Sequence, residues 1–322
     1  MSAINTIPSF LKQTHEEILE KHRRIVHEER HRLRSISAVQ NHHKFSVDEA
    51  LAHKTKNRYS DVLPYDQTRV KIRSEGGYIN ASRIMLKDIC NKTKEGYYIA
   101  TQGPMKNTVN DFWEMCKELN DEKIVIVMVT ALKEKEIDKC YQYWRDGNFD
   151  ICDSDGKTLF HFDAITHYFE DGGFEVRKWL MTDMLTSHKR EVVHFYYDAW
   201  QDFGRPNNHL DIISLAEEVI KEQKSIRNLE KNPLIVHCSA GVGRTGAFIS
   251  LHYMLSHLQD MLNTEGKFIC DGDPIEQIVY QLRKQRMLMV GPSQFQFVYD
   301  AVRSCWREQV SESVHLSEAT KK

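Results

Sequence analysis

The feature that most limits what this chain can fold into is a glycine-rich segment at residues 234–248, with the sequence LIVHCSAGVGRTGAF. Its first four residues predict a short buried strand, and the residues from Gly246 onward have a helical pattern. In a loop that joins a strand to a helix in this way, backbone N–H groups and the helix N-terminus together bind anions. The segment therefore predicts an anion-binding loop in an α/β fold.

Two side chains in this loop indicate which anion it binds. Arg244 lies six residues after Cys238, where its planar guanidinium can bind two oxygens of a phosphate. The same positive surroundings favour a cysteine thiolate, because such sites lower the usual thiol pKa of about 8.5 to roughly 3.5–7.5. A thiolate beside a bound phosphate can attack phosphorus. We expect Thr245 to donate its hydroxyl to that sulfur, and His237 to support the loop from behind.

Two other phosphate-binding motifs compete for the same segment. Its glycine spacing also matches the dinucleotide-binding fingerprint, with an acidic Glu265 about 20 residues on. That fingerprint usually opens an early βαβ unit, whereas this loop lies in the last third of the chain. It would also leave Cys238 and Arg244 without a role, so we set it aside. A Walker loop is excluded, because no Gly-Lys-Ser/Thr follows.

Residues 237–246, HCSAGVGRTG, resemble the signature loop of the phosphotyrosine-specific protein tyrosine phosphatases. The resemblance extends over about residues 56–302, and segments 78–82, 98–104 and 111–113 resemble framework motifs of that family. It implies an α/β (α+β) fold with a highly twisted mixed β-sheet flanked by helices, and a reaction that needs no cofactor or metal. Cys238 would be the nucleophile and Arg244 the phosphate-binding residue, and the loop would bind phosphate through Ser239, Ala240, Gly241, Val242 and Gly243.

The resemblance also implies how the substrate is recognised. Residues 56–61, KNRYSD, resemble the family's substrate-recognition loop. Tyr59 would stack on the phosphotyrosine ring, and Asp61 would hold the substrate backbone. A deep slot with an aromatic wall admits phosphotyrosine and leaves phosphoserine too short to reach the thiolate. We therefore expect phosphotyrosyl proteins as substrates.

Residues 200–206, WQDFGRP, resemble the mobile loop that carries the family's general acid. Departure of the tyrosyl oxygen needs a proton, and Asp202 stands at the acid position beside Trp200. Phe203 would cover the substrate ring. Residues 134–139, followed by CYQYW at 140–144, resemble the loop whose glutamate, here Glu134, braces the signature arginine, with Lys139 as a further supporting residue. Gln201 replaces the family's proline, which removes a conformational restriction and is expected to slow the chemistry.

A second departure concerns the water that hydrolyses the phosphocysteine. Gly291 stands where the family has a glutamine that positions this water, and Gln294 matches the family's second glutamine. We expect Gln294 to act in its place, with a slowed second step. The compact layout and these departures resemble the phosphatases of insect-parasitoid viruses (bracoviruses). The departures also keep open an alternative function, a weakly active or inactive protein that traps phosphotyrosyl proteins.

Composition limits the surroundings in which the chain acts. A net charge of -2 argues against a surface that is basic overall and binds nucleic acid or an anionic membrane. We expect no secretory signal in residues 1–10, no membrane span and a monomer. Seven scattered cysteines without a C-x-x-C pair predict neither a disulfide scaffold nor a zinc site. A reducing cytoplasm is therefore the expected location.

We expect one catalytic domain over residues 35–310, preceded by a helical extension over 1–34 and followed by a frayed tail over 311–322. Apolar periodicity predicts helices over 9–34, 111–119, 209–224, 246–259, 274–286 and 293–307. Alternating or continuous apolar runs predict strands over 123–130, 159–169, 174–181, 191–197 and 234–237, the second and third forming a hairpin.

Overall fold

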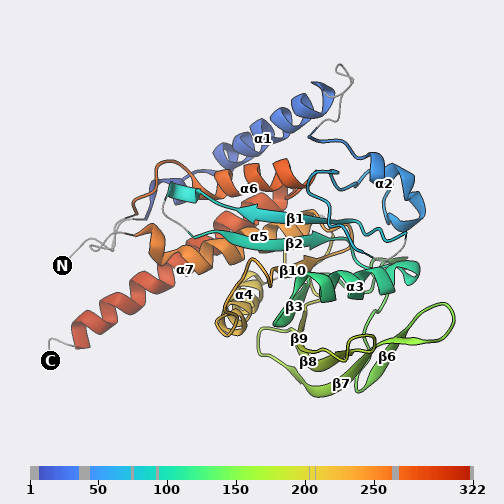
Figure 1. The fold of residues 1–322 in the computed structure, drawn as a ribbon. Coiled ribbons are helices and arrows are strands. Elements are labelled where there is room, and N and C mark those ends of the chain that lie inside the picture. The colour runs from blue at the N-terminus through green and yellow to red at the C-terminus, as the bar shows by residue number, and fades with distance from the viewer. Residues whose placement is uncertain are drawn as a thin grey trace.

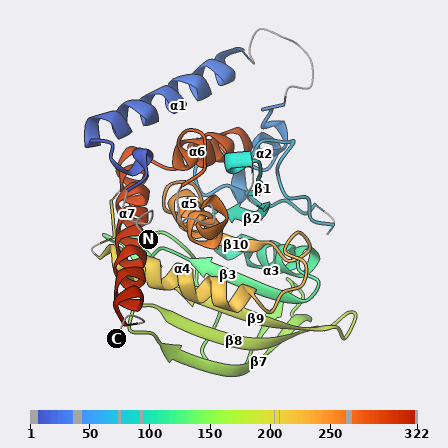
Figure 2. The ribbon, with the colours of Figure 1, turned by 90° about the vertical axis from the view of Figure 1, so that its left-hand side faces the viewer.

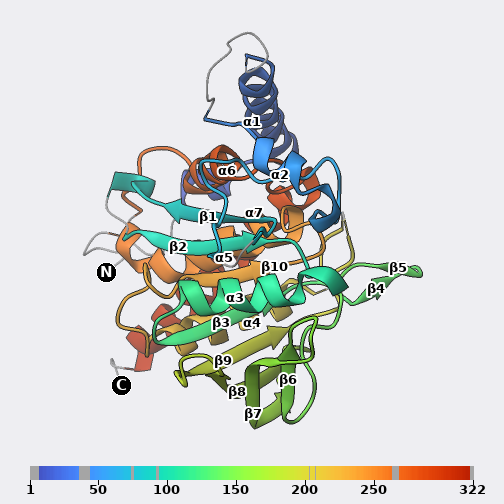
Figure 3. The same cartoon turned by 45° about the vertical axis from the view of Figure 1, so that its right-hand side comes forward.

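The structure is a computed structural model that describes residues 7–35, 44–73, 76–91, 94–202, 204–206, 208–262 and 268–319. Its centre is a mixed eight-stranded sheet (Figure 1). In spatial order the strands are β1 (Ala81–Leu86), β2 (Gly96–Thr101), β10 (Leu234–His237), β3 (Lys123–Met128), β9 (Lys189–Tyr196), β8 (Glu175–Asp183), β7 (Thr158–Phe169) and β6 (Phe149–Cys152). A separate pair, β4 (Lys133–Glu134) and β5 (Ile137–Asp138), projects from the body of the molecule (Figure 3).

The four central strands run parallel, and both flanks of the sheet are antiparallel. β10 pairs in parallel with β2 and β3, and β3 pairs in parallel with β9. Parallel strands are usually covered on both faces, which agrees with the continuous apolar sequence of β3. The order places β10, and with it the glycine-rich segment, between β2 and β3. The mixed sheet flanked by helices is the fold that the sequence predicted.

Helices cover both faces of the sheet (Figure 2). They are α1 (His15–Ser35), α2 (Asp48–Ala52), α3 (Val109–Leu119), α4 (His209–Gln223), α5 (Gly243–His257), α6 (Pro274–Gln285) and α7 (Pro292–Ala319). Along β3, Ile124 and Ile126 belong to the core that includes α3, whereas Val125 and Val127 belong to the core that includes α4 to α7. Because successive side chains of a strand alternate between faces, β3 joins the two cores.

α1 is the outermost helix and packs on α6 and α7 (Figure 1). Its buried Ile18 and Ile25, two turns apart, belong to the same core as α6 and α7, as the predicted amphipathic pattern requires. The helix begins at His15, later than predicted, because Thr14 caps it. The Thr14 hydroxyl accepts from the N–H of Glu17, and the Glu17 carboxylate accepts from the N–H of Thr14 at 2.7 Å, which is a capping box.

The predicted hairpin is present, since β7 and β8 pair antiparallel and the N–H of Gly173 donates to the carbonyl of Glu170 at the turn. The predicted strands over 123–130, 191–197 and 234–237 and the predicted helices are also found, with shifted ends. The sequence pattern did not define β1, β2 or β6. β1 and β2 overlap the segments 78–82 and 98–104 that resemble framework motifs, and β6 has only four residues.

The structure contains a disulfide that the sequence did not predict. Cys90, which follows β1, is bonded to Cys270, which precedes α6, across a separation of 180 residues. The remaining five cysteines are free, and four of them are buried. Spacing along the chain gave no sign of the pair, because only the fold brings β1 and α6 into contact.

We expect the Cys90–Cys270 disulfide to stabilise the fold by restricting the unfolded chain. Replacing both cysteines by serine should lower the free energy of unfolding by about 2–5 kcal/mol, the range for bridges that close long loops. Urea unfolding with and without a reductant measures this difference. The double variant should be insensitive to the reductant. Equal midpoints for the oxidised and reduced parent protein would show that the bridge contributes nothing.

Candidate active site

The glycine-rich loop occupies residues 238–242, between the end of β10 at His237 and the start of α5 at Gly243. α5 therefore begins three residues earlier than predicted. Gly241 has a positive φ of +72°, and a Cβ at this position would lie 2.1 Å from the carbonyl oxygen of Thr101 on β2. Only glycine fits this combination of backbone angle and close approach.

Arg286 at the end of α6 fixes the orientation of the loop backbone. Its guanidinium donates to the carbonyl oxygens of Gly241 and Ala240 at 2.8 and 3.0 Å. Because these carbonyls point toward Arg286, the N–H of Gly241 can point toward Cys238, and it donates to the sulfur at 3.3 Å. Arg286 is fully buried, and burial lowers its pKa to about 10. No role for Arg286 was predicted from the sequence.

Cys238 lies almost fully buried at the base of the loop. Burial alone opposes ionisation, but the positive charge of Arg244 and the polar groups of Thr245 and Gly241 outweigh it, so the pKa of the Cys238 thiol is lowered. The thiolate is the reactive form of cysteine. The loop thus holds Cys238 in surroundings that favour its thiolate, as its predicted role would require.

Arg244 has two buried nitrogens that make no hydrogen bond to the described residues. Its NH1 donates to Glu134 Oε1 at 2.5 Å and to the carbonyl of Trp200 at 2.6 Å. Its Nε and NH2 are buried, and neither has a hydrogen-bond partner among the residues that the structure describes. NH2 lies 3.3 Å from Asp202 Oδ1 as an ion pair. Unsatisfied buried donors are costly and rare, so this pair indicates a place for an anion.

Asp202 joins the loop at 200–206 to the loop that contains β4 and β5. Its Oδ2 accepts from Lys139 Nζ at 2.8 Å, and its backbone N–H donates to Glu134 Oε2 at 3.1 Å. Burial opposes the charge of Lys139, but Asp202 outweighs this effect and raises the lysine pKa. The structure therefore brings together Asp202, Glu134, Lys139, Trp200 and Arg244, as predicted.

Tyr59 lies beside the glycine-rich loop. Its hydroxyl is 2.9 Å from Ser239 Oγ, which donates to the carbonyl of Lys139 at 2.8 Å. Arg58 holds this segment by donating to the carbonyls of Gly103 and Pro104, a support that the sequence gave no reason to expect. Two other predicted substrate contacts are less defined. Asp61 is exposed, and Phe203 lies outside the described residues.

His237 supports the loop from behind through a buried chain of hydrogen bonds. Its Nδ1 donates to the carbonyl of Cys238 at 3.1 Å, so its Nε2 must accept from the hydroxyl of Tyr143 at 2.7 Å. That hydroxyl in turn accepts from His194 Nε2 at 2.9 Å. Burial lowers the pKa of His237 to about 4, which agrees with a neutral ring. The sequence gave Tyr143 no individual role, because nothing along the chain indicates its contact with His237.

Gln294, in the first turn of α7, is buried against the same loop. Its Oε1 accepts from the N–H of Gly291 at 2.8 Å. A Cβ on Gly243 would lie 2.8 Å from the same Oε1, which shows how closely the glutamine approaches the start of α5. The glutamine that the sequence proposed for water positioning is therefore brought to the loop.

The comparisons with known proteins agree with this geometry. The sequence model of the family described as protein-tyrosine phosphatase matches residues 53–304. The chain belongs to the protein-tyrosine phosphatase family. The fold, family and enzyme class predicted from the signature loop are thereby confirmed.

Curated relatives of this phosphatase cover most of its length. Tyrosine-protein phosphatase 1 of Saccharomyces cerevisiae is 35% identical over 92% of this chain and 96% of its own. Tyrosine-protein phosphatase non-receptor type 20 of Mus musculus is 36% identical over 80% of this chain, which spans 55% of the mouse protein. Tyrosine phosphatase H3 of Microplitis demolitor bracovirus is 32% identical over 77% of this chain and 79% of its own.

Among solved structures, one described as the structural basis of the PTPN18 fingerprint on distinct HER2 tyrosine phosphorylation sites has the same fold. It matches this phosphatase with a TM-score of 0.72 and 27% identity, over 90% of this chain and 94% of that chain. In the residues that the structure describes, no helix combines the length and the apolar character needed to cross a bilayer.

Proposed function

We propose that this phosphatase hydrolyses phosphotyrosine in proteins through a phosphocysteine intermediate. The Cys238 thiolate attacks phosphorus, the S–P bond forms as the P–O bond to tyrosine breaks, and Asp202 protonates the departing tyrosyl oxygen. Water then attacks phosphorus, the S–P bond breaks, and inorganic phosphate and the thiolate are released. The observation that carries this proposal is the pair of unsatisfied donors of Arg244, Nε and NH2, beside a cysteine whose thiol pKa is lowered.

The other predicted residues complete this proposal. Thr245 donates its hydroxyl to the sulfur as the thiolate leaves, and Gln294 positions the attacking water. The loop residues bind the phosphate oxygens through backbone N–H groups: Ser239, Ala240, Gly241, Val242 and Gly243. Tyr59 stacks on the substrate ring, Asp61 holds the substrate backbone and Phe203 covers the ring. Supporting this assignment, Tyr59 lies within hydrogen-bond distance of Ser239 in the loop.

The test is hydrolysis of a phosphotyrosyl peptide under reducing conditions, followed by released phosphate. Acid quenching during turnover should yield phosphate covalently attached to Cys238, located by peptide mass spectrometry. A phosphoseryl peptide of the same sequence is the matched control and should not be hydrolysed at a comparable rate. Phosphate release without any phosphoenzyme would contradict the covalent route, and absence of release would contradict the activity.

We expect the second step to be slow, because Gly291 replaces the water-positioning glutamine. Rapid mixing with an aryl phosphate should show a burst of phenol equal to the enzyme concentration, followed by slower turnover. In Gln294→Ala the slow phase should fall further, by about 10–100-fold for lost positioning of a reactant, while the burst persists. A linear time course without a burst would show that phosphocysteine hydrolysis does not limit the rate.

One alternative has specific support, namely a protein that binds phosphotyrosyl partners without efficient turnover. Gln201 and Gly291 both depart from the family pattern at places that govern catalysis. Intact Cys238, Arg244 and Asp202 favour the enzyme. Tight binding of the phosphotyrosyl peptide by the unmodified protein, with no burst and no steady phosphate release, would establish the alternative.

We further propose that the protein acts as a monomer in a reducing compartment, the cytoplasm, without nucleic-acid partners. The requirement for a thiolate at Cys238 supports a reducing location, whereas the Cys90–Cys270 disulfide opposes it. The near-neutral charge argues against nucleic-acid partners. The proposed division is an extension over 1–34, a catalytic domain over 35–310 and a tail over 311–322. Rapid alkylation of cell lysates tests the location, since Cys90 and Cys270 should then be recovered as free thiols. Recovery of the intact disulfide would oppose it.

A further inference from the structure

The short connection between α6 and α7 contains two non-glycine residues in an unfavourable backbone conformation. Leu288 and Val290 have φ values of +60° and +61°. The left-handed region is disfavoured for residues with a side chain, and most of all for a β-branched one such as valine. Such a conformation persists only where surrounding contacts impose it. Residues 287–291, called the brace loop below, must therefore be held from outside.

On one side the brace loop contacts the glycine-rich loop. The N–H of Val290 donates to the carbonyl of Val242 at 3.3 Å. A Cβ on Gly246 would lie 2.7 Å from a methyl carbon of Val290, so the brace loop also contacts the first turn of α5. The N–H of Gly291 donates to Gln294 at 2.8 Å. The position of the brace loop therefore sets where Gln294 and the first turn of α5 lie.

On the other side the brace loop is held by α1. Glu29, which is 2% exposed, accepts from the N–H of Leu288 at 3.0 Å and forms a buried ion pair with Arg283. His22 Nε2 lies 3.0 Å from the carbonyl of Val290 and donates to it, because a carbonyl only accepts. Arg283 NH2 donates to the same carbonyl at 2.9 Å. Both left-handed residues are thus fixed by side chains of α1.

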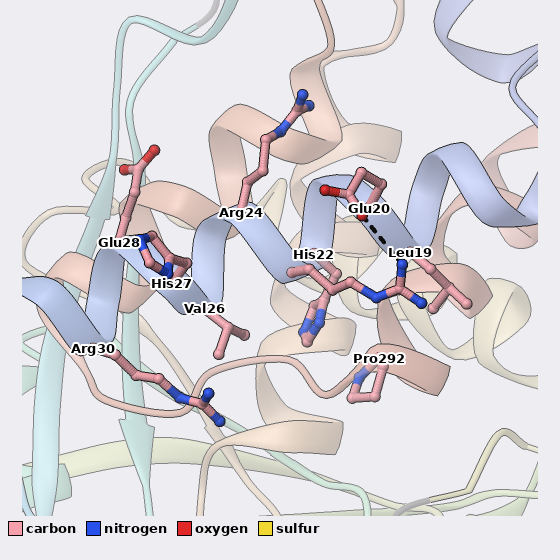
Figure 4. A pocket seen from close by; sticks show the side chains of 10 residues that line it. Leu19, Glu20, His22, Arg24, Val26, His27, Glu28, Arg30 and Pro292 are labelled. Atoms are coloured by element: carbon pink, nitrogen blue, oxygen red, sulfur yellow. Dashed lines mark hydrogen bonds and ion pairs between the residues drawn. The ribbon is translucent and has the colours of Figure 1, made fainter.

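These polar contacts join α1 to the brace loop. A hollow of about 830 Å³ extends along this face of α1 from Leu19 to Arg30, with Pro292 among the residues that line it. Figure 4 shows His22 projecting from α1 toward the side on which Pro292 lies, whereas Glu28 points the other way. Burial lowers the pKa of His22, and Arg283 adds to this effect, which agrees with a neutral ring that donates from Nε2.

We propose that Glu29 and His22 on α1 are positioning residues of the phosphatase reaction. They hold the strained brace loop against the glycine-rich loop and thereby place Gln294 for the hydrolysis of phosphocysteine. This inference rests on the proposed two-step mechanism. It assigns to the N-terminal helix a part in the second step, in addition to its contribution to the core through Ile18 and Ile25.

The test separates the two steps in Glu29→Gln, with Glu28→Gln as the matched control. Gln at 29 keeps an acceptor for Leu288 but loses the charge that pairs with Arg283. Glu28 is an exposed neighbour whose carboxylate lies 3.9 Å from Arg32. The burst amplitude per mole of enzyme counts the correctly folded sites. The burst rate reports the attack of Cys238, and the rate of the slow phase reports phosphocysteine hydrolysis. We expect Glu29→Gln to keep a full burst and to slow the second phase by about 10–100-fold, with Glu28→Gln unchanged.

Two further variants separate positioning from folding. A buried ion pair can be replaced by apolar side chains without loss of stability, so Glu29→Leu with Arg283→Leu should keep the protein folded. The double variant removes the contact of Glu29 with Leu288 and that of Arg283 with Val290. His22→Phe removes the donor to Val290, and His22→Gln restores one. The double variant and His22→Phe should slow only the second phase, and His22→Gln should recover part of the rate.

The possible failures are distinguishable. An unchanged slow phase in Glu29→Gln and in the double variant, with a normal burst, would overturn the positioning role and leave the two-step mechanism intact. A smaller burst with an unchanged slow phase per active site would show that α1 only stabilises the fold, which also overturns the proposal. If the unmodified protein forms no phosphoenzyme, the proposed function fails, and this inference fails with it.

Discussion

Cys238→Ser is expected to lower the turnover of a phosphotyrosyl peptide by about 10⁵–10⁶-fold, the loss that follows when a covalent enzyme loses its nucleophile. A serine hydroxyl cannot supply the thiolate that Arg244, Thr245 and Gly241 stabilise in the glycine-rich loop. Peptide binding should persist, because Nε and NH2 of Arg244 and the N–H groups of the loop remain. Released phosphate measures the first effect, and calorimetric titration of the peptide measures the second.

Cys152→Ser is the matched control for this loss, because Cys152 is a free but exposed thiol on β6. It should retain normal turnover. The buried thiol of Cys140 provides a second comparison, since burial raises its pKa and Cys140 should stay unreactive toward iodoacetate. Substantial turnover in Cys238→Ser, or an equal loss in Cys152→Ser, would remove Cys238 as the nucleophile.

The family and the main elements of the site could be predicted because their information is local. The strand, loop and helix at 234–248 are contiguous in the sequence, and so are the segments that contain Tyr59 and Asp202. In each case a short motif determines both the backbone conformation and the chemistry. The resemblance then supplied the bracing of Arg244 by Glu134, which the observed hydrogen bond reproduces. The contact of Arg244 with the carbonyl of Trp200 was not predicted.

The contacts that the sequence did not reveal join residues far apart in the chain. Glu29 contacts the brace loop across more than two hundred residues. Its neighbours Glu28 and Arg30 are also charged, so the sequence does not show that Glu29 is the buried one. Cys90 and Cys270 lack any informative spacing for the same reason. Tyr143 supports His237 through a hydrogen bond that only the packing of the strands creates. Support residues of this kind need a three-dimensional structure.

Asp202→Asn is expected to lower kcat/KM for a phosphotyrosyl peptide by about 10²–10⁴-fold, the usual contribution of general acid catalysis, since kcat/KM reports the first step even when the second step limits turnover. The change is nearly isosteric, so the contact with Lys139 at 2.8 Å can be kept while the proton donor is lost. The loss should depend on the leaving group. A phenol acidic enough to depart as its anion needs no proton, so the variant should hydrolyse an activated aryl phosphate at close to the normal rate.

Asp198→Asn, an exposed carboxylate just before Trp200, is the matched control and should behave like the unmodified protein toward both substrates. The steady-state kcat/KM over a series of aryl phosphates of graded phenol pKa measures the effect as a slope, which should become steeper in Asp202→Asn alone. The slope separates two causes of slow turnover. A variant that only disturbs the loop at 200–206 would lose activity equally on every substrate, whereas loss of the acid affects most the substrate with the poorest leaving group. An unchanged slope would therefore assign Asp202 to loop structure and leave the proton to another group.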